Sequence, residues 1–89
     1  MERTMRAKMI VTEVNRTGHQ NGPEYQMQDR VKMVAVAAKT YPADGADEDN
    51  TYAKFSPTGD LSLSIVNPDL IGKIQPGQKF YLDFVLADK

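Results

Sequence analysis

Three short segments of this chain carry apolar residues at nearly every position, where a strand with one wet face would alternate apolar and polar residues. The segments are residues 9–11, 33–38 and 80–86. Strands that are apolar on both faces are usually covered on both. No stretch of the sequence has the pattern of a long amphipathic helix that would supply a second cover. We therefore expect either a small closed barrel with a partner on its outside, or loops folded back over the sheet, in a protein that works by contact.

The length of the chain predicts a single small domain, residues 1–89. A domain of this size buries only about 60–65% of the surface that its unfolded chain exposes, so it usually needs additional support. The sequence contains no cysteine, which excludes a disulfide framework and a thiolate metal site. Self-association is the support that remains, and we expect a homo-oligomer or a subunit of a larger assembly.

Charge is divided unevenly along a chain whose net charge is −1. Residues 1–39 carry seven Lys and Arg against four acidic residues, a balance of +3, and residues 40–89 carry four against eight, a balance of −4. Proteins that bind duplex DNA are usually clearly basic, so this class is not favoured. The N-terminal residues have no apolar signal-peptide core, and no run is long enough to span a membrane. We expect a soluble cytoplasmic protein without a membrane partner.

Five antiparallel strands are expected from the alternation of apolar residues and from the positions of turn residues. Residues 15–23 are rich in Gly and Asn and are expected to form a loop, and a bulge is expected near residues 28–30. Residues 67–72 begin with Asn-Pro and end with Gly, which predicts one short helical turn before the last strand. The expected strands cover residues 5–14, 25–39, 51–55, 61–65 and 79–87.

These elements predict an all-β fold, a small five-stranded antiparallel barrel. The helical turn lies before the last strand, an order closer to an SH3-like barrel than to an OB-like barrel, which is the second alternative. The fourth and fifth strands are joined by a short connection, so their apolar residues are expected to be buried together. Truncation of Leu63 or Phe84 to alanine is expected to cost about 2–5 kcal/mol. The expected core residues are Leu61, Leu63, Ile65, Phe80, Leu82 and Phe84.

Residues suited to catalysis or metal binding do not form a recognisable site. His19 is the only histidine and lies in the loop rich in Gly and Asn. Asp47 and Asp49 form a pair of carboxylates, but an exposed acidic loop does not separate their pKa values. Residues 44–50 lack the spacing and the flanking helices of an EF-hand loop. We expect no enzymatic activity, no metal and no cofactor.

Aromatic residues and one strand face are the better candidates for a binding site. Tyr41 and Tyr52 flank a long acidic loop, and Lys54 is close to them in the sequence. Long loops in small domains are often functional, and exposed aromatic rings can stack on nucleic-acid bases. The alternative location is one face of the second expected strand. The candidate binding residues are Tyr41, Tyr52, Lys54, Lys32, Val34 and Val36.

Residues 49–59, with the sequence Asp-Asn-Thr-Tyr-Ala-Lys-Phe-Ser-Pro-Thr-Gly, precede an alternation of Leu and Ser, then Asn67-Pro68 and the segment 76–84. With these features, residues 5–88 resemble small β-barrel proteins of unknown function encoded by tailed bacteriophages. The shared motifs are turns and core positions, which specify a fold more than a chemistry, so no functional residue follows from them. The resemblance implies a phage origin and a location in the host cytoplasm or in the virion.

Three functions remain open. The first, which we favour, is a virion-associated or assembly protein, such as a capsid accessory subunit, that acts by contacts with itself or with a phage or host protein. The second is a phage accessory protein that binds a host factor or a nucleotide signal used in anti-phage defence. The third is a barrel that binds single-stranded nucleic acid, with an affinity that falls steeply with added salt.

Overall fold

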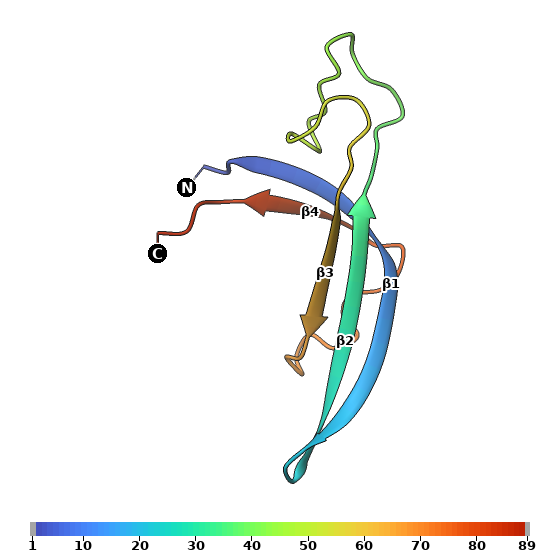
Figure 1. Cartoon of the computed structure of the whole chain (residues 1–89), viewed down its shortest axis with the longest axis vertical. Helices are drawn as coiled ribbons and strands as arrows, with labels where there is room; N and C mark the ends of the chain where they lie inside the picture. Colours follow the sequence, from blue (N-terminus) through green and yellow to red (C-terminus); the bar gives the residue numbers. More distant parts are fainter. Residues whose placement is uncertain (1, 89) are drawn as a thin grey trace.

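A computed structural model describes residues 2–88, which form one open antiparallel sheet (Figure 1). The strand order is β3-β2-β1-β4, and the molecule measures 58 × 32 × 16 Å, so it is thin in one direction. The expected all-β antiparallel fold is confirmed. The sheet has four strands and stays open, whereas five strands closed into an SH3-like or OB-like barrel were expected. The strands are β1 Met5–Asn21, β2 Glu24–Ala35, β3 Asp60–Ile65 and β4 Lys79–Phe84.

The centre of the fold is a long hairpin of β1 and β2, joined by the two residues Gly22 and Pro23. Gly22 has a φ of 62°, which suits the first central position of a type II′ hairpin turn. The prediction of a loop over residues 15–23 was therefore wrong. The polar residues before the turn continue β1 to Asn21, because a two-residue turn lets both strands pair up to the turn itself.

The two outer strands cover different lengths of the hairpin. β3 pairs with residues 29–34 of β2, and β4 pairs with residues 5–10 of β1. The remaining hairpin residues near the turn form a two-stranded arm that extends away from the rest of the sheet (Figure 1). The register of the hairpin shifts between Val11 and Glu13 of β1, so the bulge lies there and not at residues 28–30.

The core lies on one face of the sheet, under the connection from β3 to β4. This connection, residues 66–78, must cross β2 and β1 because β3 and β4 lie at opposite edges (Figure 1). It contributes Ile74 to the core. The buried apolar residues come from the two central strands, and they are Ala7, Met9, Val11, Val31 and Met33.

A long connection, residues 36–59, ends the pairing of β2 with β1. The buried side chain of Asn50 accepts a hydrogen bond from the Lys8 amide at 2.9 Å and donates one to the Val36 carbonyl at 2.9 Å. Asn50 therefore takes the place of a strand residue where the backbones of β1 and β2 separate. This contact explains why β2 ends at Ala35, four residues earlier than the expected 25–39.

Two further expected elements are turns. Residues 51–55 form no strand, because a turn joins Asn50 to Ala53 and Phe55 has a φ of 59°, outside the extended region. Residues 67–72 contain a turn from Asn67 to Leu70 in place of a helical turn, although Asn67 does accept the Asp69 amide. The alternating strand of residues 61–65 is confirmed as β3, and the last strand ends at Phe84 and not at residue 87.

The expected core is only partly correct. Leu61, Ile65, Phe80 and Leu82 pack against the buried cluster, but Leu63 and Phe84 are 47% and 46% exposed. The reason is the strand order, which places β3 and β4 on opposite edges with two strands between them. Their apolar residues therefore border the core from two sides and do not pack together at its centre.

Met33 and Leu63 provide a matched test of where the core lies. Met33 is 5% exposed, so Met33→Ala is expected to lower the free energy of unfolding by about 2–5 kcal/mol. Leu63→Ala is expected to cost clearly less, because much of that side chain is already in contact with water. Urea unfolding of both variants measures the difference. An equal loss in the two variants would contradict the described core.

Candidate functional site

The outer edge of β2 is unpaired along the hairpin arm. The Ala35 amide donates to the Gly59 carbonyl on the β3 side, and strand backbones alternate in direction, so Met27 and Tyr25 also point their amides and carbonyls to that side. β3, however, ends opposite Asp29. Within residues 2–88, no strand pairs with β2 beyond this point. The arm therefore presents backbone donors and acceptors ready to pair with an extended chain.

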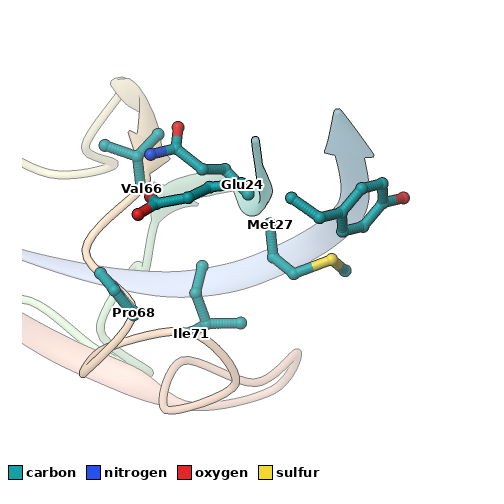
Figure 2. Close-up of a pocket in the computed structure, with 7 residues that line it drawn as sticks. Glu24, Met27, Val66, Pro68 and Ile71 are labelled. Atoms are coloured by element: carbon teal, nitrogen blue, oxygen red, sulfur yellow. The ribbon is translucent and has the colours of Figure 1, made fainter. Parts of the chain in front are cut away.

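A groove of about 410 Å³ runs beside this unpaired edge (Figure 2). One wall is the arm, with Glu24 and Met27, and the other is the start of the connection to β4, with Val66 and Ile71 (Figure 2). Most of its side chains are apolar, while Glu24 and Gln26 add polar groups at its border. Its lining residues are Glu24, Tyr25, Gln26, Met27, Val66, Pro68 and Ile71.

Tyr25 is positioned by a glycine on the neighbouring strand. A Cβ atom added to Gly18 would lie 2.6 Å from Cε1 of the Tyr25 ring, so the ring lies directly over the backbone of β1. Gly18 and Tyr25 are on the same face of the arm, in the diagonal positions through which aromatic side chains reach across strands. The glycine thus gives the exposed Tyr25 ring a defined place at the groove.

A buried carboxylate fixes the opposite wall. Asp29 is fully buried and accepts Arg16 Nε at 2.7 Å and Arg16 Nη2 at 3.2 Å, and its second oxygen also accepts the Gly72 amide at 2.9 Å. Gly72 has a φ of 83°, a conformation that glycine adopts without strain. We call Asp29, Arg16 and Gly72 the Asp29 clamp. It ties the connection to the arm one residue after Ile71, and so sets the width of the groove.

The clamp also sets the charge of its carboxylate. The hydrogen bonds from Arg16, and then the one from Gly72, lower the pKa of Asp29 below its ordinary value, although burial opposes this. Asp29 is therefore ionised at neutral pH and is held by three donors. Such a group is suited to holding the structure together and not to transferring protons.

The groove has the chemistry of a site for an extended peptide. Unpaired backbone groups at Tyr25 and Met27 match those of an incoming strand, and an apolar pocket beside them accepts alternate side chains of that strand. Such an arrangement would recognise a main chain in general and would select side chains by size and polarity. Glu24 is the one carboxylate among the lining residues of the groove.

The candidate residues on β2 lie elsewhere on the sheet. Lys32 and Val34 are on the face opposite the core, where Val34 is 40% exposed and Lys32 forms an ion pair with Glu13 at 3.4 Å. Val36 follows the end of β2 and is half-buried. These three residues are not part of the groove.

The candidate residues in the long connection belong to its own packing. Tyr41 contacts the Phe55 ring edge-on, with ring centroids 6.1 Å apart, and its hydroxyl accepts the Ala38 amide. Burial, and then the charge of Asp47, raise the pKa of Tyr52. Lys54 is exposed. Tyr41 is therefore held by internal contacts, whereas Tyr52 is 36% exposed and has its hydroxyl beside Gly59.

The acidic residues of this connection are used locally. Asp47 accepts hydrogen bonds from the Asp49 and Asn50 amides and from the Asn50 side chain, and Asp49 forms an ion pair with Lys8.

Among residues 2–88 no cluster of three or more potential metal ligands is found. The same residues include no helix with the length and apolar character needed to cross a membrane.

The groove was missed because its residues are polar or isolated in the sequence. Tyr25 and Met27 alternate with polar residues, which is the pattern of a strand with one covered face. Val66 and Ile71 lie in a segment rich in turn residues. The available signal was the Gly22-Pro23 turn, since a hairpin ending there makes β2 longer than β3 and leaves part of its edge unpaired.

No family model matches this chain, and neither a curated protein nor a solved structure matches it.

The Asp29 clamp predicts a defined pH dependence of stability. Because the pKa of Asp29 is lowered below its ordinary value of 3.8, the carboxylate stabilises the fold above that pH and loses this effect as the pH falls through the lower pKa of the folded state. Asp29→Asn removes the titrating group. The variant is expected to be less stable at neutral pH, and its stability is expected to fall less steeply than that of the wild type below about pH 4.

Urea unfolding at a series of pH values measures how steeply the free energy of unfolding falls with pH in the wild type and in Asp29→Asn. The carboxyl of Asp83, whose pKa is also lowered, chiefly by its hydrogen bonds with Arg6, titrates in both proteins and serves as a common background. Parallel pH profiles for wild type and Asp29→Asn would contradict the role given to the clamp.

Proposed function

We propose that this protein is a non-catalytic binding and assembly protein that holds an extended segment of a partner protein in the groove beside β2. The observation that carries the proposal is the unpaired edge of β2 at Tyr25 and Met27 next to an apolar groove. An incoming strand would pair with these residues in line with β3 and place apolar side chains between Met27 and Ile71.

The stability of the arm supports this proposal. A two-stranded hairpin is only marginally stable in water, and a third strand adds both hydrogen bonds and apolar contacts. The exposed apolar residues on the arm and its opposite wall, Tyr25 at 65% and Val66 at 55%, would lose water on binding. The clamp holds both walls in place beforehand, which reduces the entropy lost when a partner binds.

The biological setting is proposed from the sequence resemblance. A chain similar to small tailed-phage proteins would act as a virion-associated or accessory subunit, located in the virion or in the host cytoplasm. Mass spectrometry of purified virions separates a subunit that stays in the particle from an accessory protein that binds a host factor.

Absence of enzymatic activity is part of the proposal. It is supported by Asp29 and Asp83, because these two carboxyls with lowered pKa are both bound to arginines.

Single-stranded nucleic acid is the second candidate ligand, because of one aromatic residue on the face opposite the core. The Tyr81 ring is 54% exposed, and the guanidinium carbon of Arg6 lies 4.4 Å from its centroid. Lys8 approaches the same ring, at 5.9 Å. However, Arg6 is bonded to Asp83 and Lys8 to Asp49, so much of the positive charge is already neutralised. We therefore place this ligand second.

Selection from a library of displayed peptides tests the groove. Peptides selected on the wild type are expected to alternate apolar side chains and to protect the Tyr25 and Met27 amides from hydrogen exchange. Ile71→Arg places a charge in the groove and is expected to lower their affinity about tenfold or more, since burial of one such side chain is worth about 1.5–3 kcal/mol.

Leu70→Arg is the matched control for this experiment. Leu70 is the neighbouring residue, is 47% exposed and does not line the groove, so the same change there is expected to leave peptide affinity unchanged. Peptides that bind Ile71→Arg as well as the wild type, or a selection that yields none, would contradict the proposed function.

A titration with a fluorescent oligothymidylate at low and high salt tests the second candidate. Under the favoured proposal we expect no more than weak binding that disappears with added salt and does not change in Tyr81→Ala. Tight binding that is lost in Tyr81→Ala would instead indicate stacking of bases on the Tyr81 ring and would favour the nucleic-acid function.

A further inference from the structure

The outer edge of β4 is a second unpaired strand edge, at the other side of the sheet from β3. The Val11 amide donates to the Gln78 carbonyl, so Gln78 and every second residue after it direct their backbone groups toward β1. Lys79, Tyr81 and Asp83 therefore direct their amides and carbonyls outward. Within residues 2–88 no strand lies on that side of β4.

We propose that two copies of this chain join through β4, antiparallel and in register about Tyr81, to form one continuous sheet. The sheet would run β3-β2-β1-β4 in one copy and continue with β4-β1-β2-β3 of the second, giving twice the four strands of a single chain. This inference keeps the premise of the proposed function, that the protein works through contacts. It concerns a different edge and a different partner from the groove.

Backbone geometry restricts the possible registers. Outward-pointing residues of one copy must face outward-pointing residues of the other for both amides and carbonyls to bond. With Tyr81 on the two-fold axis, Tyr81 faces Tyr81 of the second copy, and Lys79 faces Asp83. All the outward backbone groups of β4 are then paired, because residues 79–83 match residues 83–79 of the second copy.

Charge selects this register among those that the backbone allows. Lys79 is exposed, and no carboxylate of residues 2–88 lies within ion-pair distance of it. Asp83 accepts three donors, Arg3 Nη1 and Arg6 Nε on one oxygen and Arg6 Nη2 on the other, out of about four acceptor positions in a carboxylate. One position on Oδ2 therefore remains for Lys79 of the second copy. The two-fold axis creates this ion pair twice.

Apolar contacts on the other face agree with the same register. Phe80 faces Leu82 of the second copy, and both side chains are only partly buried at the border of the core. Joining the two sheets would extend the core face of each across the axis. On the opposite face the two Tyr81 rings, each beside Arg6, would become neighbours.

The free edge of β3 does not offer an equivalent match. Its residues alternate Leu and Ser, and a two-fold pairing about Ser62 would place Asp60 opposite Ser64. Such a pairing contains no ion pair, and the Ser64 hydroxyl already accepts a hydrogen bond from Arg30 at 2.9 Å. The β4 edge is therefore the better surface for a second copy.

Single cysteines test the register directly, because the chain has no cysteine of its own. Residues of a hydrogen-bonded antiparallel pair have Cα atoms about 5.5 Å apart, within the range that a disulfide spans. Tyr81→Cys is expected to form a covalent dimer readily under mild oxidation, and Ser62→Cys, at the corresponding place on β3, is not. Cross-linking of Ser62→Cys alone, or of neither variant, would overturn the proposal.

Sedimentation of the wild type and of charge variants tests the ion pair. Lys79→Glu would place two acidic side chains opposite each other and is expected to weaken the dimer roughly tenfold or more. Lys73→Glu, which makes the same change at an exposed lysine of the connection, is expected to leave the dimer intact. A wild-type protein that stays monomeric at all concentrations, or equal effects of the two variants, would contradict the β4 dimer.

The groove variant separates this inference from the proposed function. Ile71→Arg is expected to dimerise like the wild type, and Lys79→Glu is expected to bind selected peptides like the wild type. Loss of dimerisation in Ile71→Arg would mean that the second copy occupies the groove and would overturn the β4 interface. Dimerisation through β4 without any peptide binding would contradict the groove alone.

Discussion

The ion pair between the buried Asp29 and the half-exposed Arg16, with the Gly72 amide, is the contact on which most of this structure depends. The sheet is a single layer, and residues 66–78 form the connection that crosses its core face. The clamp attaches that connection to the arm at Gly72, and Ile74 then follows directly over the core. A fully buried carboxylate without these donors would carry a large desolvation cost, so the connection and the charge stabilise each other.

A thin sheet with one covering connection leaves edges and apolar surface exposed. Natural proteins usually protect such edges with short strands, charges or bulges, because an unpaired edge is a template for pairing with another chain. The exposed edges of β2 and β4 differ in what they can bind. The edge of β2 lies beside an apolar groove and suits an extended partner segment, whereas the edge of β4 carries Lys79 and Asp83 in positions that complement a second copy. The same contacts with other chains would therefore cover the exposed edges of the sheet and carry out the proposed function.

The sequence allowed local elements to be predicted better than their arrangement. The Leu and Ser alternation of β3 and the all-β class were evident, because side chains of a strand alternate between its two faces. The order of the strands was not evident, since it depends on the long connection passing over β2 and β1. For that reason Leu63 and Phe84 were expected at the centre of the core and are half exposed at its border.

Single residues account for the other differences between the fold expected from the sequence and the observed fold. Asn50 ends the pairing of β1 and β2 by side-chain hydrogen bonds to residues far from it in the sequence. No local sequence pattern predicts such a contact. The Gly22-Pro23 turn was visible, but it was interpreted as part of a loop, so the arm and its groove were not predicted. The candidate residues Tyr41 and Tyr52 were chosen for their chemistry, and the structure uses them in packing and in a hydrogen bond inside the long connection.

The central claim is that the exposed edges of β2 and β4 are the contact surfaces of this protein. Amide hydrogen exchange of the purified wild type, followed at low and at high protein concentration, measures it most directly. The account predicts that the Lys79, Tyr81 and Asp83 amides exchange rapidly in dilute solution and become protected as the concentration rises, while the Ser62 amide on the β3 edge stays unprotected. Amides of β4 that exchange at the same rate at every concentration would contradict it.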